Sequence, residues 1–536
     1  MRTFNEVAQA IIDETIKSAI LIDDSIPKPF SGETEVVDIC QSMYESFHDK
    51  QCSLDFYKYT NESDNEIENK VKLLFERKDL LVLDWELNST EPKYKSTLDI
   101  INRAVYTDNL HFICIYSKVG DKTDDIFYKI MSYFSGNNLD QIENLNTEVG
   151  NLLEADGSDY TEIIDSIKSS FKELTLGVLS AKEISVTLGN SMNKKTYGQF
   201  RKILNDKLPQ NKSYCSLSRF GFIINDELLY KSDPKDVYLR CNHMGNYLQI
   251  NNTLISVFPK TTPAKDLYEQ FCNAIINAND NFLTIMSLEL RNQLLERSAF
   301  IGKDLSKVDE KAFFHHMETI NPDYSFYEFL ISLWSAQNTT FLHEQIPQIF
   351  STLSEYKVNK GIDLNNQGNL QLFENDLTKL NYFYNTDYKS SKNDKVGFGD
   401  IFSVYDKDIF KYYLICITPH CDCLHPDNIN GFYHFVRGAK TSYQIALNKP
   451  ESSFTSFIKE KDNYVPIEWT DKPFTLYLCE DQRICGEDPK KVIIGEDTLD
   501  IKFLCKIKDN YAQRIANNAF AHPIRVGITF AEIKNA

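Results

Sequence analysis

The first 175 residues alternate short apolar runs with segments that carry a single apolar face. The apolar runs are residues 18–22, 80–83 and 111–116, and a run of mixed polarity covers residues 52–59. Short, almost continuous apolar runs are typical of strands that are buried on both faces of a parallel sheet. The segments that predict amphipathic helices cover residues 1–17, 34–49, 64–77, 97–105, 124–134 and 160–174. This order of elements predicts an α/β domain with right-handed crossovers.

The alternation weakens after residue 135. Residues 135–160 are polar and acidic, and the best candidate for a fifth strand among them is residues 149–153. With residues 160–174 as the last helix, we expect the first domain to end near residue 175.

Residues 176–356 predict a middle domain that is first mixed and then helical. A helical part over residues 181–208 precedes strand-like runs at 237–240, 247–250 and 253–257. The last two runs flank Asn251 and Asn252, a pair that favours a hairpin turn. Helical patterns then dominate residues 264–356.

The last part of the chain is richer in strand-like runs. Residues 357–395 are rich in Asn, Lys, Asp and Ser and predict a linker or exposed loops. Residues 396–536 predict a small β-rich domain, with strand-like runs at 401–404, 412–417, 474–478 and 501–507. The predicted fold class is therefore multidomain, α/β followed by α+β.

Composition agrees with several packed domains. The chain has 536 residues, of which 42% are hydrophobic and 12% aromatic, and a formal net charge of −19. This charge argues against a nucleic-acid-binding surface over the whole molecule, although it leaves room for a local basic patch. No secretory signal and no apolar stretch of about 18 residues is present, so we expect neither export nor a membrane span. The twelve cysteines then predict reduced thiols in a cytoplasmic protein.

Three of the predicted strands end in residues that carry chemistry. The first is followed by Asp23 and Asp24, the second by Asp84 and the third by Ser117. A single strand that ends in Asp usually marks a turn or a helix cap. Because the carboxyl ends of parallel strands meet at the edge where open α/β sheets bind ligands, all four residues together indicate a site.

These strand-end residues resemble the receiver domain of two-component signalling, which has a flavodoxin-like parallel sheet. The resemblance implies that Asp23 and Asp24 hold a Mg²⁺ ion together with Asp84. It also implies that Asp84 accepts a phosphoryl group, and that Ser117 bonds this group and acts as the switch. The chemistry needs such residues, because a carboxylate that attacks an anion requires a cation to screen both charges.

One element of the receiver pattern is missing from the expected place. Receiver domains usually carry a Lys after the fifth strand, yet there is no Lys or Arg between Lys129 and Lys168. Lys118, which directly follows Ser117, is a possible substitute. Two hypotheses therefore remain: a working phosphoacceptor, or a pseudo-receiver scaffold that assembles a complex without being phosphorylated.

A second group of reactive residues lies in the predicted C-terminal domain. It consists of His420, Cys421, Asp422, Cys423 and His425, directly after an apolar run. A zinc site is one interpretation, with Cys479 and Cys485 as remote ligands, but the spacing differs from the usual C-x₂₋₄-C pairs. A catalytic thiol is another, with Cys421 as nucleophile and His420 or His425 as base. The third is a turn stabilised by Asp422 with incidental thiols.

The strand-end residues, together with CITPHCDCLHP and the closing YAQRIANNAFAHPIRVGITF, resemble a bacterial group of long proteins with an N-terminal response-receiver domain. Members occur in predicted conflict and anti-phage systems beside a histidine-kinase-like ATPase. The resemblance implies such an ATPase as partner and a signalling role in defence. The favoured interpretation is a signalling protein and not an enzyme, with the scaffold and a C-terminal Cys/His enzyme as alternatives.

Overall fold

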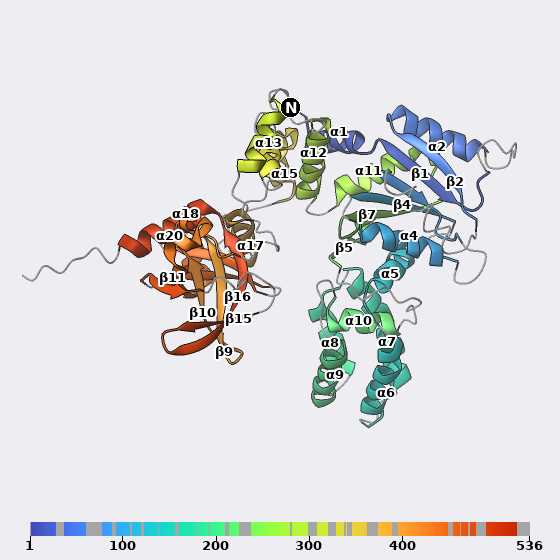
Figure 1. Cartoon of the computed structure of the whole chain (residues 1–536). Helices are drawn as coiled ribbons and strands as arrows, with labels where there is room; N and C mark the ends of the chain where they lie inside the picture. The colour runs from blue at the N-terminus through green and yellow to red at the C-terminus, as the bar shows by residue number, and fades with distance from the viewer. Residues whose placement is uncertain are drawn as a thin grey trace, which may run out of the picture. The chain divides into compact units, whose positions relative to one another are not determined.

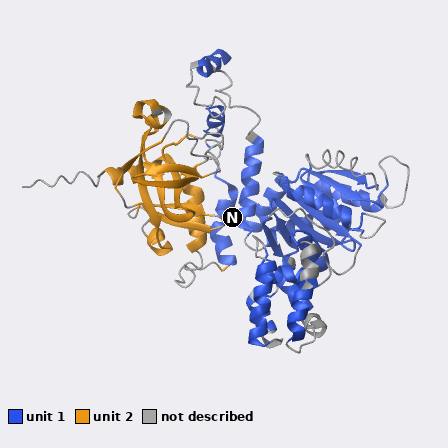
Figure 2. Cartoon of the chain, turned by 60° about the horizontal axis from the view of Figure 1, so that its bottom comes forward, with its two compact units in different colours: residues 1–319, 326–360 blue, residues 320–325, 361–536 orange. Residues whose placement is uncertain are grey.

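The computed structural model divides the chain into two compact units, each of which is described here by itself (Figure 2). Unit 1 comprises residues 1–319 and 326–360, and unit 2 comprises residues 320–325 and 361–536. The structure describes residues 2–27, 37–60, 78–87, 93–107, 110–118, 123–137, 139–155, 160–177, 179–191, 193–208, 214–224, 237–278, 281–297, 308–319, 329–336, 339, 346–361, 374–387, 395–448, 454–460, 463–469, 472–478 and 489–521.

Unit 1 is built on a seven-stranded sheet with the order β2-β1-β3-β4-β7-β6-β5 (Figure 1). Its first five strands in this order are parallel, and β6 and β5 extend it as an antiparallel pair. The strands are β1 (Ser18–Asp23), β2 (Ser53–Lys58), β3 (Leu80–Leu83), β4 (His111–Ser117), β5 (Leu239–Asn242), β6 (Tyr247–Ile250) and β7 (Thr253–Pro259). The order 2-1-3-4 followed by a fifth parallel strand is that of a doubly wound, flavodoxin-like sheet, which confirms the predicted N-terminal fold.

Successive side chains along the buried strands belong alternately to two separate hydrophobic cores. Leu80 and Val82 of β3 face one core, whereas Leu81 and Leu83 face the other. The first core includes residues of α1 (Phe4–Thr15), α2 (Val37–Asp49), α11 (Leu267–Asn277) and α12 (Phe282–Arg297). The second includes residues of α4 (Lys95–Val105) and α5 (Thr123–Tyr133). Helices thus cover both faces of the sheet, and the helix predicted over residues 64–77 lies outside the described residues.

A group of helices, here called the helical insert, lies between α5 and β5 in the chain. It contains α6 (Leu139–Ala155), α7 (Tyr160–Thr175), α8 (Ala181–Ser191), α9 (Lys194–Lys207) and α10 (Ser216–Ile224), which share their own apolar core. The insert is fastened to α5: the Tyr214 hydroxyl donates to the Met131 carbonyl at 2.9 Å, and the rings of Phe222 and Tyr128 lie 5.0 Å apart. Figure 1 shows the insert projecting from the sheet.

The predicted fifth strand at residues 149–153 is wrong, because these residues lie in α6. The buried residues Leu145, Val149 and Leu153 are spaced four apart, which is the period of a helix face and not of a strand. The fifth parallel strand is β7, and it pairs with β4 from Thr253 to Pro259. The sheet therefore continues well past residue 175, where the sequence predicted the end of the domain.

The strands predicted around Asn251 and Asn252 are confirmed. β6 and β7 are antiparallel, and Asn251 in the turn has a φ of 49°, a conformation that Asn tolerates better than most residues. Further along the chain, unit 1 contains η2 (Ala264–Asp266), α13 (Glu310–Thr319), η4 (Gln348–Thr352) and α15 (Leu353–Asn359).

Unit 2 is built on a nine-stranded antiparallel sheet, which agrees with the predicted β-rich C-terminal part. Its strands are β8 (Thr386–Asp387), β9 (Asp400–Asp406), β10 (Ile409–Cys416), β11 (Phe432–Lys440), β12 (Thr455–Glu460), β13 (Asn463–Trp469), β14 (Phe474–Tyr477), β15 (Lys490–Ile494) and β16 (Asp497–Ile507). Its helices are α17 (Glu374–Asn385), α18 (His420–Leu424), η6 (Pro426–Ile429), α19 (Tyr443–Asn448) and α20 (Asp509–Ala521).

The segment predicted as a linker, residues 357–395, is partly structured. It contains α17, which contacts β12 and β13, and β8, which pairs with β16. Tyr382 of α17 packs against the core of unit 2, so this helix is held by tertiary contacts despite its polar sequence. Among the described residues, no helix is long and apolar enough to cross a membrane.

Candidate functional site

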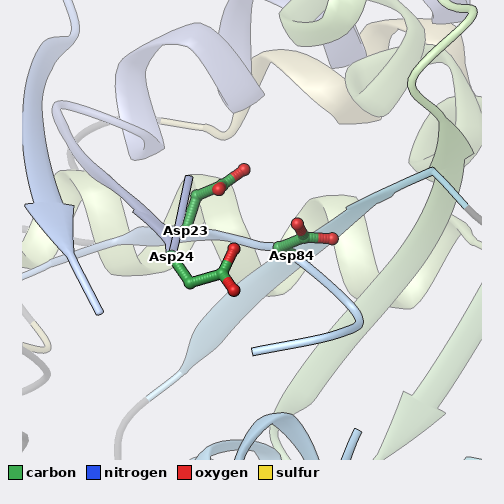
Figure 3. Close-up of side chains that lie close together, drawn as sticks. All are labelled: Asp23, Asp24 and Asp84. Atoms are coloured by element: carbon green, nitrogen blue, oxygen red, sulfur yellow. The ribbon is translucent and has the colours of Figure 1, made fainter. Parts of the chain in front are cut away.

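Three carboxylates meet at the carboxyl edge of the unit 1 sheet (Figure 3). Asp23 is the last residue of β1 and Asp84 directly follows β3; the two strands are parallel neighbours with Ile22 opposite Leu83. The Asp84 amide donates to the Ile22 carbonyl at 3.0 Å, which holds the two strand ends together. One carboxylate oxygen from each of Asp23, Asp24 and Asp84 lies within 4.8 Å of the others. Asp23 and Asp84 are buried, with exposed fractions of 4% and 5%, whereas Asp24 is exposed.

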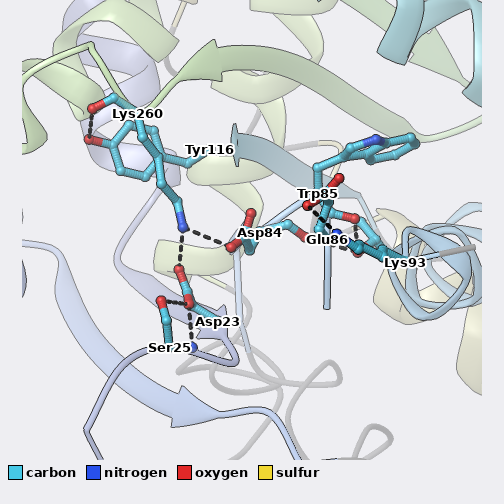
Figure 4. Close-up of polar contacts among 9 residues, drawn as sticks. Asp23, Ser25, Asp84, Trp85, Glu86, Lys93, Tyr116 and Lys260 are labelled. Atoms are coloured by element: carbon cyan, nitrogen blue, oxygen red, sulfur yellow. Dashed lines mark hydrogen bonds and ion pairs between the residues drawn. The ribbon is translucent and has the colours of Figure 1, made fainter. Parts of the chain in front are cut away.

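Lys260 lies directly after β7 and reaches the cluster formed by Asp23, Asp24 and Asp84, here called the carboxylate cluster (Figure 4). Its Nζ is 2.7 Å from Asp23 Oδ2 and 2.7 Å from Asp84 Oδ2. Two bonds hold the Lys260 segment against the end of β4: the Lys260 amide donates to the Ser117 carbonyl at 2.7 Å, and the Tyr116 hydroxyl donates to the Thr262 carbonyl at 2.7 Å. The partly buried ammonium thus bridges two carboxylates that come from different strands.

Lys260 occupies the position, after the fifth parallel strand, at which the receiver pattern predicts a Lys. The sequence placed that position too early, because the helical insert separates β4 from β7 and the fifth strand is reached only at residue 253. The sequence does contain a signal: residues 253–257 predict a strand, and Lys260 follows them closely. Its neighbouring hairpin made that strand look like part of a second domain. Lys118, the possible substitute, is exposed.

The surroundings of the two buried carboxylates differ. Asp23 Oδ1 accepts hydrogen bonds from the Ser25 amide at 2.7 Å and from the Ser25 hydroxyl at 2.6 Å. At Asp84 it is the backbone that is fixed, since the Thr97 hydroxyl lies 2.8 Å from the Asp84 carbonyl and 3.0 Å from that of Trp85. The Trp85 ring is buried and stacks on Tyr94 with 5.1 Å between centroids. The Asp84 carboxylate itself accepts hydrogen bonds from Lys260 and from the Glu86 backbone.

The pKa values of Asp23, Asp84 and Lys260 are shifted in different directions. Burial raises the pKa of Asp23, but the bond and charge of Lys260 and the bonds from Ser25 outweigh burial, so this pKa is lowered overall. Burial raises the pKa of Asp84, and the Asp23 charge raises it further; Lys260 offsets only part of this, so the pKa is raised overall. Burial lowers the pKa of Lys260, yet Asp84 and Asp23 together hold that pKa above its ordinary value.

Two of these shifts predict how the contribution of Lys260 to stability depends on pH. Asp23 has a lowered folded pKa, so its stabilisation is present above about pH 4 and is lost as pH falls through the folded pKa. Lys260 has a raised folded pKa, so its stabilisation is complete below about pH 10.4 and is lost as pH rises through the folded pKa. Denaturant unfolding of wild type and Lys260→Met across this range should show a difference in the free energy of unfolding that is largest between these limits. A difference that stayed constant from about pH 3 to about pH 11 would contradict the ion-pair assignment.

Ser117 is the last residue of β4 and is 1% exposed. Its carbonyl accepts the bond from the Lys260 amide, and α5, to which the helical insert is fastened, begins at Thr123. Ser117 thus ends the strand that precedes α5 in the chain and is bonded through its backbone to Lys260.

The carboxylate cluster fits a divalent cation. With all four groups ionised, three carboxylates and one ammonium leave an excess of two negative charges. All three candidate ligands are hard oxygen donors, the class that Mg²⁺ prefers. Within the described part of the chain, this is the one group of at least three His, Cys, Asp or Glu side chains close enough to hold a metal ion.

The second group predicted from the sequence does not assemble a site among the described residues. Cys421 is exposed, and its Sγ is 3.7 Å from Asp422 Oδ1; the described contacts contain no bond from it to His420 or His425. Cys423 is buried and donates to the Thr418 carbonyl at 3.3 Å. A hydrogen bond with Cys416, together with burial, raises the pKa of the Cys423 thiol far above its ordinary value. Cys479 and Cys485 lie outside the described residues.

Comparison with known proteins gives one match. Residues 15–159 match the family model of the response receiver domain. No curated protein and no solved structure matches the chain. The matched residues contain β1 to β4 with Asp23, Asp24, Asp84 and Ser117, whereas β7 and Lys260 lie beyond them. The chain therefore carries an N-terminal response receiver domain, whose sheet gains its fifth parallel strand after the helical insert.

Proposed function

We propose that unit 1 is a phosphorylation-controlled signalling receiver in which Asp84 accepts a phosphoryl group. The observation that carries this proposal is the position of Lys260, whose Nζ is 2.7 Å from both Asp23 and Asp84. A receiver domain by itself suggests phosphorylation-based signalling. The apparent absence of a Lys supported the pseudo-receiver alternative, and the position of Lys260 supports the phosphoacceptor instead.

In the proposed reaction a carboxylate oxygen of Asp84 attacks the phosphorus of a phosphohistidine on the partner. A P–O bond forms and the P–N bond breaks, and the leaving imidazole nitrogen takes a proton from solvent. Mg²⁺ bound by Asp23, Asp24 and Asp84 would screen the negative charge of the phosphoryl group. Lys260, released from its bond to Asp84, pairs with the phosphoryl oxygens, and the Ser117 hydroxyl bonds them from the end of β4.

The partner and the setting are part of the proposal. Resemblance to receiver proteins of bacterial conflict systems supports a histidine-kinase-like ATPase as phosphoryl donor and a role in antiviral defence. The proposed location is the cytoplasm, where such a donor would be found. Ser117 and the start of α5 give the phosphorylated state a route to the helical insert, since added charge biases elements next to the site.

Beryllofluoride, a mimic of the phosphoryl group, tests the proposal. With Mg²⁺ present it should raise the melting temperature of the full chain and change the fluorescence of Trp85, which is buried beside Asp84. Both responses should need Mg²⁺ and should be absent in Asp84→Asn. Asp49→Asn, at an exposed position at the end of α2, is the matched control and should respond like wild type. Equal responses of Asp84→Asn and wild type would rule out Asp84 as the acceptor.

A further inference from the structure

Helix α9 of the helical insert is basic in an otherwise acidic chain. Its 14 residues, KKTYGQFRKILNDK, contain five basic residues and one acidic residue, whereas the whole chain has a net charge of −19. Lys207, at its C-terminal end, pairs with Glu148 of α6 at 3.5 Å. The remaining basic residues lie in the first two and a half turns of the helix.

The two faces of α9 are sharply different. Thr196, Phe200 and Leu204 are buried, at the spacing of one helix face, and Phe200 and Leu204 belong to the core of the insert. The outward face is exposed and has no acidic side chain before Asp206; its residues are Lys194, Lys195, Gly198, Gln199 and Lys202. Figure 1 shows α9 towards the end of the insert that is far from the sheet.

Two features of this outward face oppose helix stability. Lys194 and Lys195 occupy the first turn, where the helix dipole disfavours positive charge, and no acidic residue is there to balance them. Gly198 lies in the helix interior, where Gly is less favourable than Ala, although a Cβ there would meet nothing within 4 Å. Neither feature helps the fold. Lysines lie on both sides of Gly198, which has no side chain. This arrangement suits a bulky anion that approaches the helix backbone closely.

We propose that the outward face of α9 binds double-stranded DNA through its major groove. A helix of 14 residues is about 21 Å long, and the major groove of B-DNA, about 12 Å wide, admits a helix. Lys194, Lys195 and Lys202 reach backbone phosphates, and Gln199, between them, reaches base edges, where Gln pairs with adenine. Duplex RNA fits less well, because its major groove is too narrow for side chains to read. This site is distinct from the carboxylate cluster and does not depend on phosphorylation of Asp84.

Fluorescence anisotropy with the full chain and a labelled DNA duplex of about 30 base pairs tests the proposal. The test variant is K194E/K195E/K202E, and the matched control is K265E/K311E/K357E, which changes three exposed lysines elsewhere in unit 1 by the same total charge. Glu in the first turn of α9 is favourable for the helix, so the test variant should fold, as circular dichroism will show.

Wild type and control should bind DNA with similar affinity, and the test variant should bind at least about tenfold more weakly. The slope of its salt dependence should fall by about 0.9 for each phosphate that the variant no longer neutralises. Gln199→Ala should leave the salt slope unchanged. Absence of DNA binding by wild type at low salt, or equal weakening in the test and control variants, would overturn the proposal. Binding of duplex RNA or polyglutamate as tightly as DNA would also overturn it, in favour of a general polyanion or an acidic protein.

Discussion

Replacing Lys260 by Met should lower the free energy of unfolding of unit 1 by about 3 kcal/mol at neutral pH, because removal of one partner of a buried ion pair leaves the other charge uncompensated. Here two carboxylates lose their partner at once, and their side chains are only 6% and 7% exposed. Met retains much of the length of the Lys side chain, so most of the effect reports the lost charge. Denaturant unfolding of the full chain in a W334F/W469F background, in which Trp85 is the remaining tryptophan, measures it by fluorescence.

Mg²⁺ should restore part of the stability that Lys260→Met loses, since a cation held by Asp23, Asp24 and Asp84 would replace the missing positive charge. Lowering the pH should also restore it, because the unpaired carboxylates become protonated more readily in the folded state than in the unfolded chain. Lys118→Met is the control: Lys118 is exposed, and its replacement should change stability by less than about 0.5 kcal/mol. Equal effects of the two substitutions would show that Lys260 does not stabilise the carboxylate cluster.

Incubation with Mg²⁺ and a small acyl phosphate should transfer one phosphoryl group to Asp84 and none to Asp23. Asp23 accepts three hydrogen bonds, two from Ser25 and one from Lys260, and its pKa is lowered. Asp84 has a raised pKa, and a more basic carboxylate is the better nucleophile. The difference between the two environments therefore predicts which of the two buried carboxylates reacts.

Borohydride reduction converts an aspartyl phosphate to homoserine, so peptide mapping can locate the modified residue. We expect homoserine at position 84 in wild type and complete loss of incorporation in Asp84→Asn. Lys260→Arg, which keeps the charge but changes its geometry, should retain the fold and reduce the rate of incorporation. Homoserine at position 23, or undiminished incorporation in Asp84→Asn, would assign the chemistry to another residue.

Much of the fold of unit 1 could be predicted because its strands are recognisable from the local sequence alone. Leu80–Leu83 and His111–Ser117 are buried along their whole length, and such strands must be almost continuously apolar whatever their neighbours are. Parallel pairing then places their carboxyl ends side by side, so Asp23, Asp24 and Asp84 could be grouped before any contact was known. The three carboxylates are indeed close together in the structure.

The reactive residues of unit 2 show where local pattern misleads. His420, Cys421, Asp422, Cys423 and His425 are dense in sequence, but α18 is a short helix that turns Cys421 outwards and Cys423 into the core. Density in sequence produces a metal site only when the backbone points the side chains to one place, and a helical turn separates adjacent residues.

The sequence by itself determined the parallel sheet, the acidic residues at its edge and the β-rich composition of the last part of the chain, because burial and strand pairing constrain residues close in sequence. Tertiary structure alone decided how the site is completed. Lys260 lies 176 positions after Asp84, yet their side chains are 2.7 Å apart. A strand of a parallel sheet can pair with its neighbour whatever the length of the intervening chain, since lengthening a loop costs little free energy. The helical insert lies in this intervening chain, and so the Lys that pairs with the two buried carboxylates is not found by counting along the sequence.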